Sequence, residues 1–165
     1  MKRNATLATG RILVLILLVS VPMTGMAQKK TDFTGNWKLN RQESKLNPER
    51  SFAPHQINIA QDGTSINLEI MNNFQGNPVT RNEKVMLDGS ESRNPGWRDT
   101  ETVSVATWED GGKKLTIVTT METMNGGTMK ITRKLSKENG SLFIQNSLEG
   151  GRGDSPPETW VFDKE

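Results

Sequence analysis

After residue 31 the chain alternates apolar and polar residues in short runs, and this period of two restricts its fold more than any other feature. Successive side chains of a β-strand point to opposite faces, so each run predicts a strand with one face buried and one in water. Abundant Thr, Ser, Asn and Gly also favour a β structure over a helical bundle. We count eight or nine runs, whose apolar members are Phe33, Trp37 and Leu39; Ile57 and Ile59; Ile66, Leu68 and Ile70; Val85 and Leu87; Val103 and Val105; Leu115 and Ile117; Ile131 and Leu135; Leu142, Ile144 and Leu148; and Trp160 to Phe162.

Short turn sequences separate the runs. Asp62-Gly63, Asp88-Gly89 and Asn139-Gly140 offer residues that tolerate positive φ, as tight hairpin turns require. Consecutive hairpins make an antiparallel meander, whose edges are commonly managed by closing into a barrel or by packing as a sandwich. Residues 41–50 suggest one short helical turn after the first strand, and residues 88–100 read as a long polar loop. We predict an all-β, up-and-down barrel of eight or nine strands.

Residues 1–27 have the pattern of a cleavable signal peptide. A positively charged start is followed by the apolar run Ile12–Val19, and the small residues that a signal peptidase needs lead up to Ala27. Cleavage is expected between Ala27 and Gln28. The run is too short for a membrane-spanning helix, which needs about twenty apolar residues. We therefore expect an exported protein, periplasmic or secreted, whose residues 28–165 form one domain without a membrane anchor.

Removing the signal also changes the charge. The full chain has 21 basic and 19 acidic residues, and three of the basic ones lie in the signal, which leaves 18 basic against 19 acidic residues. This balance removes the support for nucleic acid or an anionic membrane surface as a partner. The chain has no cysteine, which excludes a disulfide, a lipid-modified cysteine and a thiol nucleophile.

The segment 32–40, DFTGNWKLN, carries a resemblance to a known family. It resembles the Gly-x-Trp opening strand of the lipocalin and wider calycin barrels. More closely, it is similar to small exported bacterial domains, usually called lipocalin-like, that begin with F-[ST]-G-x-W-K-L-N. In that group the likeness extends to a T-R-K-L-S segment, here residues 132–136, and to a closing strand, here residues 160–164. The Thr-Asp-Tyr motif of lipocalins is absent, and the chain has no tyrosine.

The resemblance implies a barrel whose cup holds a small apolar molecule, and an arginine of a late strand that stacks on the tryptophan of the opening strand. Periodicity gives an independent reason to examine Arg133, because it shares a face with Ile131 and Leu135, where an unpaired cation is costly. A guanidinium lying on the indole of Trp37 would lower that cost. We therefore predict that Trp37 and Arg133 touch at the closed end of the barrel, in a structural role.

Three further aromatic residues are candidates for contact with a ligand. Phe74, Trp97 and Trp108 lie outside the first and last strands, Trp97 in the long polar loop and Trp108 beside a turn. Aromatic side chains at an open mouth commonly fix a ligand. The alternative is that these residues plug an end of the barrel.

Catalytic and metal-binding patterns are weak. His55 is the only histidine of the chain, and no cysteine or second histidine can join it in a metal site. The chain has no nucleophile elbow, phosphate-binding loop or metal-ligand spacing. Strand carboxylates mostly alternate with apolar residues and are expected on the outer face: Glu69, Glu83, Glu101, Glu109, Glu122 and Glu158. We therefore predict no metal, no cofactor and no enzymatic activity.

The leading hypothesis is an exported domain that binds a small hydrophobic or amphipathic ligand inside a β-barrel. The first alternative is a protein-interaction or adhesion module with a filled barrel, acting through residues 88–100 and 149–157, the latter with an Arg152-Gly153-Asp154 tripeptide. The second is an envelope hydrolase or isomerase, which would need inward carboxylates with raised pKa values.

Overall fold

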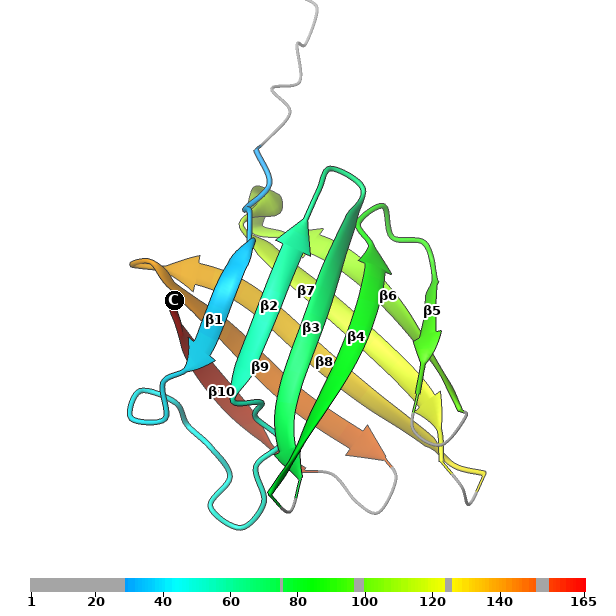
Figure 1. The fold of residues 1–165 in the computed structure, drawn as a ribbon. Helices are drawn as coiled ribbons and strands as arrows, with labels where there is room; N and C mark the ends of the chain where they lie inside the picture. Colours follow the sequence, from blue (N-terminus) through cyan, green and yellow to red (C-terminus); the bar gives the residue numbers. More distant parts are fainter. Residues whose placement is uncertain (1–28, 75, 97–99, 124–125, 151–154) are drawn as a thin grey trace, which may run out of the picture.

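A computed structural model describes residues 29–74, 76–96, 100–123, 126–150 and 155–165. They form one antiparallel sheet of ten strands that curls into a barrel (Figure 1). The strands are β1 (Gly35–Leu39), β2 (Gln56–Gln61), β3 (Ser65–Phe74), β4 (Asn77–Met86), β5 (Ser92–Pro95), β6 (Glu101–Glu109), β7 (Lys114–Glu122), β8 (Thr128–Glu138), β9 (Ser141–Gly150) and β10 (Ser155–Lys164).

The first and last strands close the sheet. β1 pairs with β10, with Trp37 opposite Lys164, and every other ladder joins strands that follow each other along the chain. β4 and β5 also follow each other along the chain, but no ladder joins them, because they are the two ends of the sheet order. The predicted up-and-down meander is therefore confirmed as a nearly closed barrel, with a seam between β4 and β5.

The barrel has ten strands rather than eight or nine, because β5 lies inside the predicted polar loop of residues 88–100. The two buried residues of β5 are Ser92 and Asn94, so its inward face has no apolar residue that could signal a strand. After β1, a single turn closed by a bond from the Ser44 N–H to the Asn40 carbonyl lies near the predicted helical turn and does not extend into a helix. The helical segment that the structure does describe is the 3-10 turn Asp110–Gly112.

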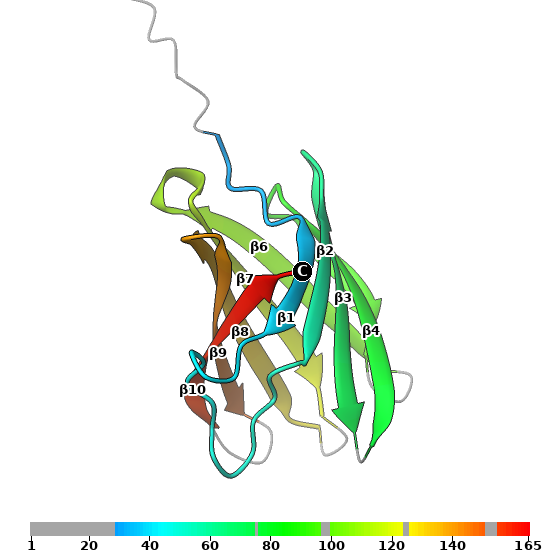
Figure 2. The same ribbon diagram turned by 60° about the vertical axis from the view of Figure 1, so that its left-hand side comes forward.

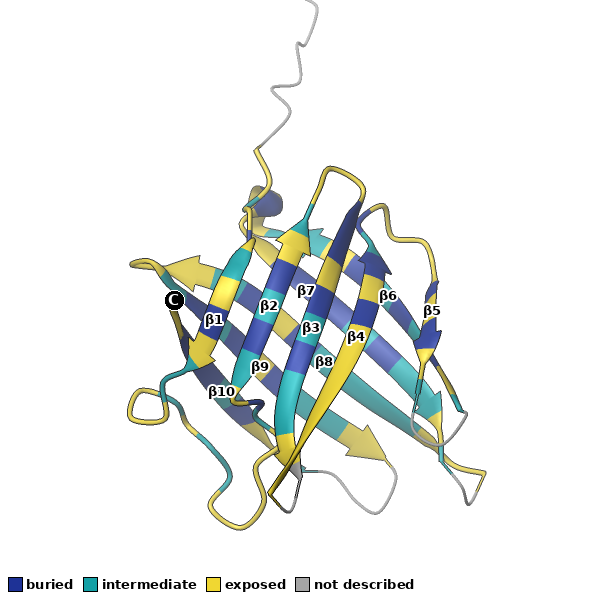
Figure 3. Ribbon diagram, viewed as in Figure 1, coloured by how far each residue is buried: buried dark blue, intermediate teal, exposed yellow. Residues whose placement is uncertain are grey.

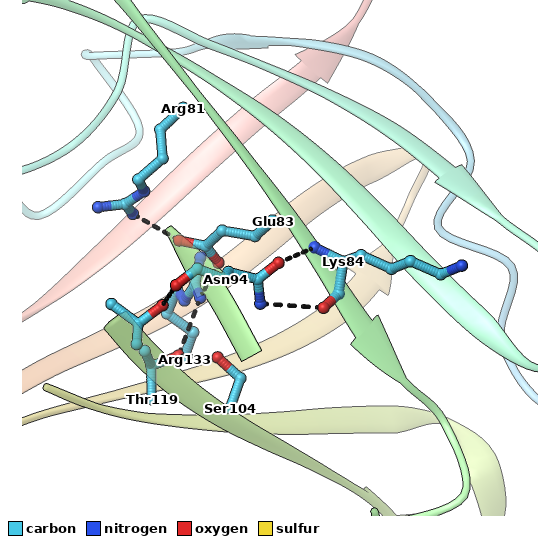
Figure 4. A network of polar contacts seen from close by, with 8 residues as sticks. Arg81, Glu83, Lys84, Asn94, Ser104, Thr119 and Arg133 are labelled. Carbon is cyan, nitrogen blue, oxygen red and sulfur yellow. Dashed lines mark hydrogen bonds and ion pairs between the residues drawn. The ribbon is translucent and has the colours of Figure 1, made fainter. Parts of the chain in front are cut away.

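Side chains from β5 hold the seam where backbone bonds are missing. The carboxamide of Asn94 accepts a hydrogen bond from the Lys84 N–H at 2.8 Å and donates one to the Lys84 carbonyl at 3.0 Å (Figure 4). Ser92 Oγ accepts the N–H of Met86 at 2.8 Å. Asn94 thus satisfies both backbone groups that β4 presents at Lys84, as an adjacent strand would do.

The segment before β1 covers one end of the barrel, where it lies beside the 3-10 turn (Figure 2). The Thr31 N–H donates to the Gly112 carbonyl at 2.8 Å, and Phe33 inserts with no exposed surface. The indole N–H of Trp37, also fully buried, donates to the Phe33 carbonyl at 2.9 Å. We refer to this as the closed end of the barrel.

Buried residues alternate with intermediate or exposed ones along β2 and most of β3, whereas β4 is exposed from Asn77 to Asn82 (Figure 3). The β8–β9 turn uses the predicted Asn139-Gly140 pair at φ 51° and 90°, as a two-residue hairpin turn needs. Within the described residues, no helix is long and apolar enough to span a membrane.

Candidate functional site

The inside of the barrel changes character along its axis. Toward the closed end it is apolar, with a core that includes Trp37, Ile66, Leu115, Ile117, Leu142 and Phe162. Further from the closed end the inward positions on β4 and on β6 to β9 are polar yet still buried, whereas those on β2 and β3 remain apolar. We call these residues the polar belt: Glu83, Ser104, Thr119, Arg133 and Asn146.

Strand periodicity explains why the belt faces inward. Glu83 lies two residues before Val85 on β4, and Arg133 lies two residues before Leu135 on β8. Val85 and Leu135 are both buried in the core, so Glu83 and Arg133 share their faces. The curvature of the barrel then brings β4 and β8, which are not neighbours in the sheet, to within reach across the interior.

The centre of the belt is a carboxylate held by two arginines (Figure 4). Arg133 Nη2 lies 2.5 Å from Glu83 Oε2, and Arg81 Nη2 lies 2.8 Å from Glu83 Oε1. Arg133 Nη2 also donates to Thr119 Oγ1 at 3.3 Å, and Thr119 in turn is hydrogen-bonded to Ser104 at 2.8 Å. The side chains of Arg133 and Glu83 are 7% and 5% exposed, whereas that of Arg81 is 43% exposed.

The arginines also determine the ionisation of Glu83. Burial alone would raise the pKa of Glu83, but the charges of Arg133 and Arg81 outweigh it and hold this pKa below its usual value of 4.5. Glu83 is therefore ionised at neutral pH. A lowered pKa is the opposite of what the hydrolase hypothesis requires of an inward carboxylate, because a general acid must keep its proton near neutral pH.

Among the described residues, one donor of the belt, Arg133 Nε, is buried without a hydrogen-bond acceptor. The other buried acid, Glu158, does not supply one, because its oxygens accept the backbone N–H groups of Asn47 and Phe52 and the indole N–H of Trp160. Glu158 thus fastens the β1–β2 loop and is not a partner of Arg133.

Beyond the belt, toward the end opposite the closed one, the inward side chains become apolar again and are only partly covered. Met121 of β7 pairs with Met129 of β8, and Ile131 pairs with Leu148 of β9. All four have intermediate exposure, and Val79 on β4 is 38% exposed. We call this the open end of the barrel, since solvent reaches its inward side chains.

The structure gives Trp37 and Arg133 other partners than the predicted ones. The cations over the Trp37 ring are Lys137, with Nζ 5.4 Å from the ring centroid, and Lys164 at 5.9 Å. Arg133 is buried as expected, but its contacts are with Glu83 and Thr119. A facing carboxylate supplies both an opposite charge and a hydrogen-bond acceptor, which makes it a stronger partner for a buried guanidinium than an indole face.

The three aromatic residues predicted at one mouth do not share an end. Trp108 packs at the closed end, stacked on Phe33 with ring centroids 6.1 Å apart and with Lys30 Nζ 5.4 Å from its ring. It therefore plugs this end. Phe74 ends β3 at the opposite end, where its backbone pairs with Asn77, and Trp97 lies outside the described residues. From Phe74 the chain runs along β4, β5 and most of β6 before it reaches Trp108, so the two residues lie at opposite ends of the barrel. Without β5, the same path would place both residues at one end.

Two of the carboxylates expected on the outer face point inward. Glu83 and Glu158 are 6% and 4% exposed. The signal was present in the sequence, since each lies two residues before a residue assigned to the core, Val85 and Trp160. Arg81 could not be recognised as a site residue from the sequence pattern, because its role depends on Glu83 being inside.

Two hollows on the outer face are formed by described residues. One, of about 470 Å³, lies over β1 to β4 among short polar side chains that include Asn36, Asn58 and Asn82. The other, of about 260 Å³, lies over β7 to β10 beside Phe143. Neither contains the polar belt as a whole. Within the part of the chain that the structure describes, no three histidine or acidic residues are grouped as metal ligands.

Comparisons with known proteins agree with the fold. No family model matches the chain, and no curated protein matches it. Among solved structures, a zebrafish ileal bile acid-binding protein complexed with cholic acid is similar with a TM-score of 0.54 and 16% identity over 81% of this chain and 98% of that one. A Caenorhabditis elegans lipid binding protein is similar with a TM-score of 0.52 and 17% identity over 87% of this chain and 99% of that one. At these identities the likeness shows a shared fold, a nearly closed antiparallel β-barrel.

Proposed function

We propose that this chain is an exported, non-enzymatic domain that binds a small amphipathic molecule inside its barrel. The observation that carries the proposal is the order of the layers: a sealed apolar end, a buried polar belt in which Arg133 Nε has no acceptor among the described residues, and an open end lined by partly exposed Met121, Met129, Ile131 and Leu148. Binding sites for small molecules combine mostly apolar walls with a few placed polar groups in this way.

The open end supplies the free energy of binding. Each CH₂ group of a ligand that is taken out of water contributes about 0.8 kcal/mol to binding. Burial of an alkyl chain of about ten carbons would therefore contribute on the order of 8 kcal/mol, from which the costs of association are subtracted. Methionine side chains at Met121 and Met129 adapt to different shapes, which suits a flexible ligand. The polar belt would orient the ligand.

The two similar solved structures support the class of ligand. One is named for bile acids and is bound to cholic acid, and the other is named for lipids. Both kinds of molecule are amphipathic and fit the layered interior described above. The predicted signal, residues 1–27, lies outside the described residues, and export remains part of the proposal.

Native mass spectrometry of the protein purified gently from its own host tests this function, followed by organic extraction of any adduct. A bound lipid or other amphipathic molecule that is lost on extraction is the expected result. A clean mass of the ligand-free chain, together with unchanged tryptophan fluorescence on titration with apolar ligands, would refute the proposal. That outcome would favour the loop-mediated interaction module.

A further inference from the structure

We infer that the outer face of β1 to β4 is a further binding site, separate from the barrel interior, for an uncharged saccharide. The inference does not depend on what the barrel binds. It rests on a row of polar side chains that crosses the four strands, on the hollow beside this row and on the balanced charge of the lining.

The row takes one outward side chain from each strand, and the four strands lie side by side (Figure 1). Asn36 of β1 is opposite Asn58 of β2 in the sheet register. Glu69 of β3 is opposite Asn58 on one side and opposite Asn82 of β4 on the other. Each of the four adjoins a buried residue of its own strand, so its side chain points to the outer face. Since neighbouring strands are about 4.8 Å apart, the row is about 14 Å long. We call these four residues the outer row.

Three members of the outer row are asparagines, which are uncommon inside strands. Asparagine is depleted there because its side chain competes for the backbone hydrogen bonds of the ladder. On the outer face of β6 to β8 the corresponding positions carry residues of high strand propensity: Thr107, Val118, Thr120 and Thr132. The asparagines therefore do not follow from the needs of the sheet. Departures from local preference of this kind are expected at functional sites.

The hollow lies beside the outer row. Along the next row of outward positions, Ala60 is opposite Asn67, and Asn67 is opposite Lys84. Because the side chain of Ala60 is a single methyl group, space is left between the longer side chains around it. The hollow has a volume of about 470 Å³. Pockets for small molecules commonly measure about 300–1,000 Å³, so this one is large enough to hold a ligand.

One amide of the outer row is fixed and others are available to a ligand. The side chain of Asn58 accepts a hydrogen bond from Gln56 Nε2 at 3.1 Å and donates one to Glu69 Oε2 at 2.7 Å. Within the part of the chain that the structure describes, the side-chain amides of Asn36, Asn67 and Asn82 make no hydrogen bond. All three border the hollow, so their donors and acceptors face the same space.

The charge and polarity of the lining indicate the class of ligand. The charged side chains that border the hollow on the outer face, Glu69 and Lys84, have opposite signs, while Glu83 points into the barrel. A nucleic acid or another polyanion needs an excess of cations, which this lining lacks. Of the described lining residues, Ala60 alone presents an apolar side chain to the outer face, so a peptide would find no pocket for apolar side chains.

A saccharide matches the groups that remain. A side-chain amide offers both donors and an acceptor, and each sugar hydroxyl likewise donates and accepts. The available amides of Asn36, Asn67 and Asn82 can therefore each pair with a hydroxyl without leaving a group of either partner unsatisfied. The balance between Glu69 and Lys84 favours a sugar without net charge.

An array that carries neutral glycans, anionic glycans and peptides tests the inference on the unmodified protein. We expect saturable binding to uncharged oligosaccharides, and competition by the same oligosaccharide added in solution. Binding confined to anionic glycans, a preference for peptides, or no signal above background would overturn the inference. Each of these results leaves the proposal for the barrel interior untouched, because that site is on the other side of the sheet.

Nuclear magnetic resonance and a pair of variants locate the site. In the unmodified protein, the oligosaccharide that binds best on the array should shift the side-chain amide signals of Asn36, Asn67 and Asn82. Replacing all three by threonine should weaken binding by about tenfold or more, because three hydrogen bonds are lost. The midpoint of urea unfolding should not fall, since threonine has the higher strand propensity.

Gln145→Thr is the matched control, because it removes an exposed amide from the outer face of β9. It should leave binding unchanged. Shifts confined to residues away from β1 to β4, unchanged affinity in the triple variant, or an equal loss in Gln145→Thr would show that the saccharide does not bind at the outer row.

Discussion

Replacing Glu83 should destabilise the protein much more than replacing Arg133, although the two form one ion pair. Glu83→Gln keeps the shape of the side chain but leaves the buried Arg133 without an ionic partner, a change that costs about 3–5 kcal/mol in comparable pairs. Arg133→Met removes the buried cation itself, and Glu83 keeps Arg81 at 2.8 Å. That loss of charged hydrogen bonds should cost about 1–3 kcal/mol.

Urea unfolding at pH 7, followed by far-UV circular dichroism, measures both costs. The double variant should be no less stable than Glu83→Gln alone, because the cation that Glu83→Gln leaves unpaired is then absent. Lys134→Met, on the outer face, should change the free energy of unfolding by less than about 0.5 kcal/mol. Equal costs for the two single variants, or costs that simply add in the double variant, would refute the role assigned to the two arginines.

The pH dependence of this comparison has a definite sign. The pKa of Glu83 is lower in the folded protein than its usual value of 4.5, so the stability contributed by its charge is complete above pH 4.5. It is lost as the pH falls through the lowered pKa, where Glu83 becomes protonated. The difference in stability between the natural protein and Glu83→Gln should therefore shrink in this acid range and stay constant above it.

Three other predictions concern separate parts of the chain. Asn94→Leu should lower the free energy of unfolding by about 1–3 kcal/mol and speed hydrogen exchange of the Lys84 amide, because both backbone groups of Lys84 lose their partner at the seam. The control Arg93→Leu should leave that exchange unchanged. The pKa of Asp62, measured by NMR, should be about 2, because the N–H groups of Thr64 and Ser65 donate to its carboxylate; a value near 3.8 would contradict this arrangement. The protein recovered from the host envelope should have the mass of residues 28–165. A mass that includes residues 1–27 would contradict cleavage.

Much of the fold could be predicted because a strand has a simple period. Alternation assigned Trp37, Leu115 and Ile144 to the interior, and the structure buries all three. The Asn139-Gly140 turn was recognisable because positive φ is accessible to few residues. β5 could not be recognised because its inward residues, Ser92 and Asn94, are polar, so apolar and polar residues do not alternate along it.

The candidate site was only partly accessible to the same reasoning. The position of Arg133 on a buried face followed from β8 alone, and it was correct. Its partner did not follow, because Glu83 is fifty residues away on a strand that is not adjacent in the sheet. The expected stacking on Trp37 was replaced by an ion pair and by lysines over the indole, a choice among partners that no local pattern encodes.

The sequence by itself determined which face of most strands is buried and where most hairpins turn, because both depend on neighbouring residues in one strand or turn. The tertiary structure decided what meets across the interior: Glu83 with Arg133, Asn94 with the edge of β4, and Trp108 with the closed end. Those contacts depend on the number of strands and on how the sheet curls. β5, which the sequence pattern did not reveal, is the strand that puts Trp108 at the opposite end from Phe74.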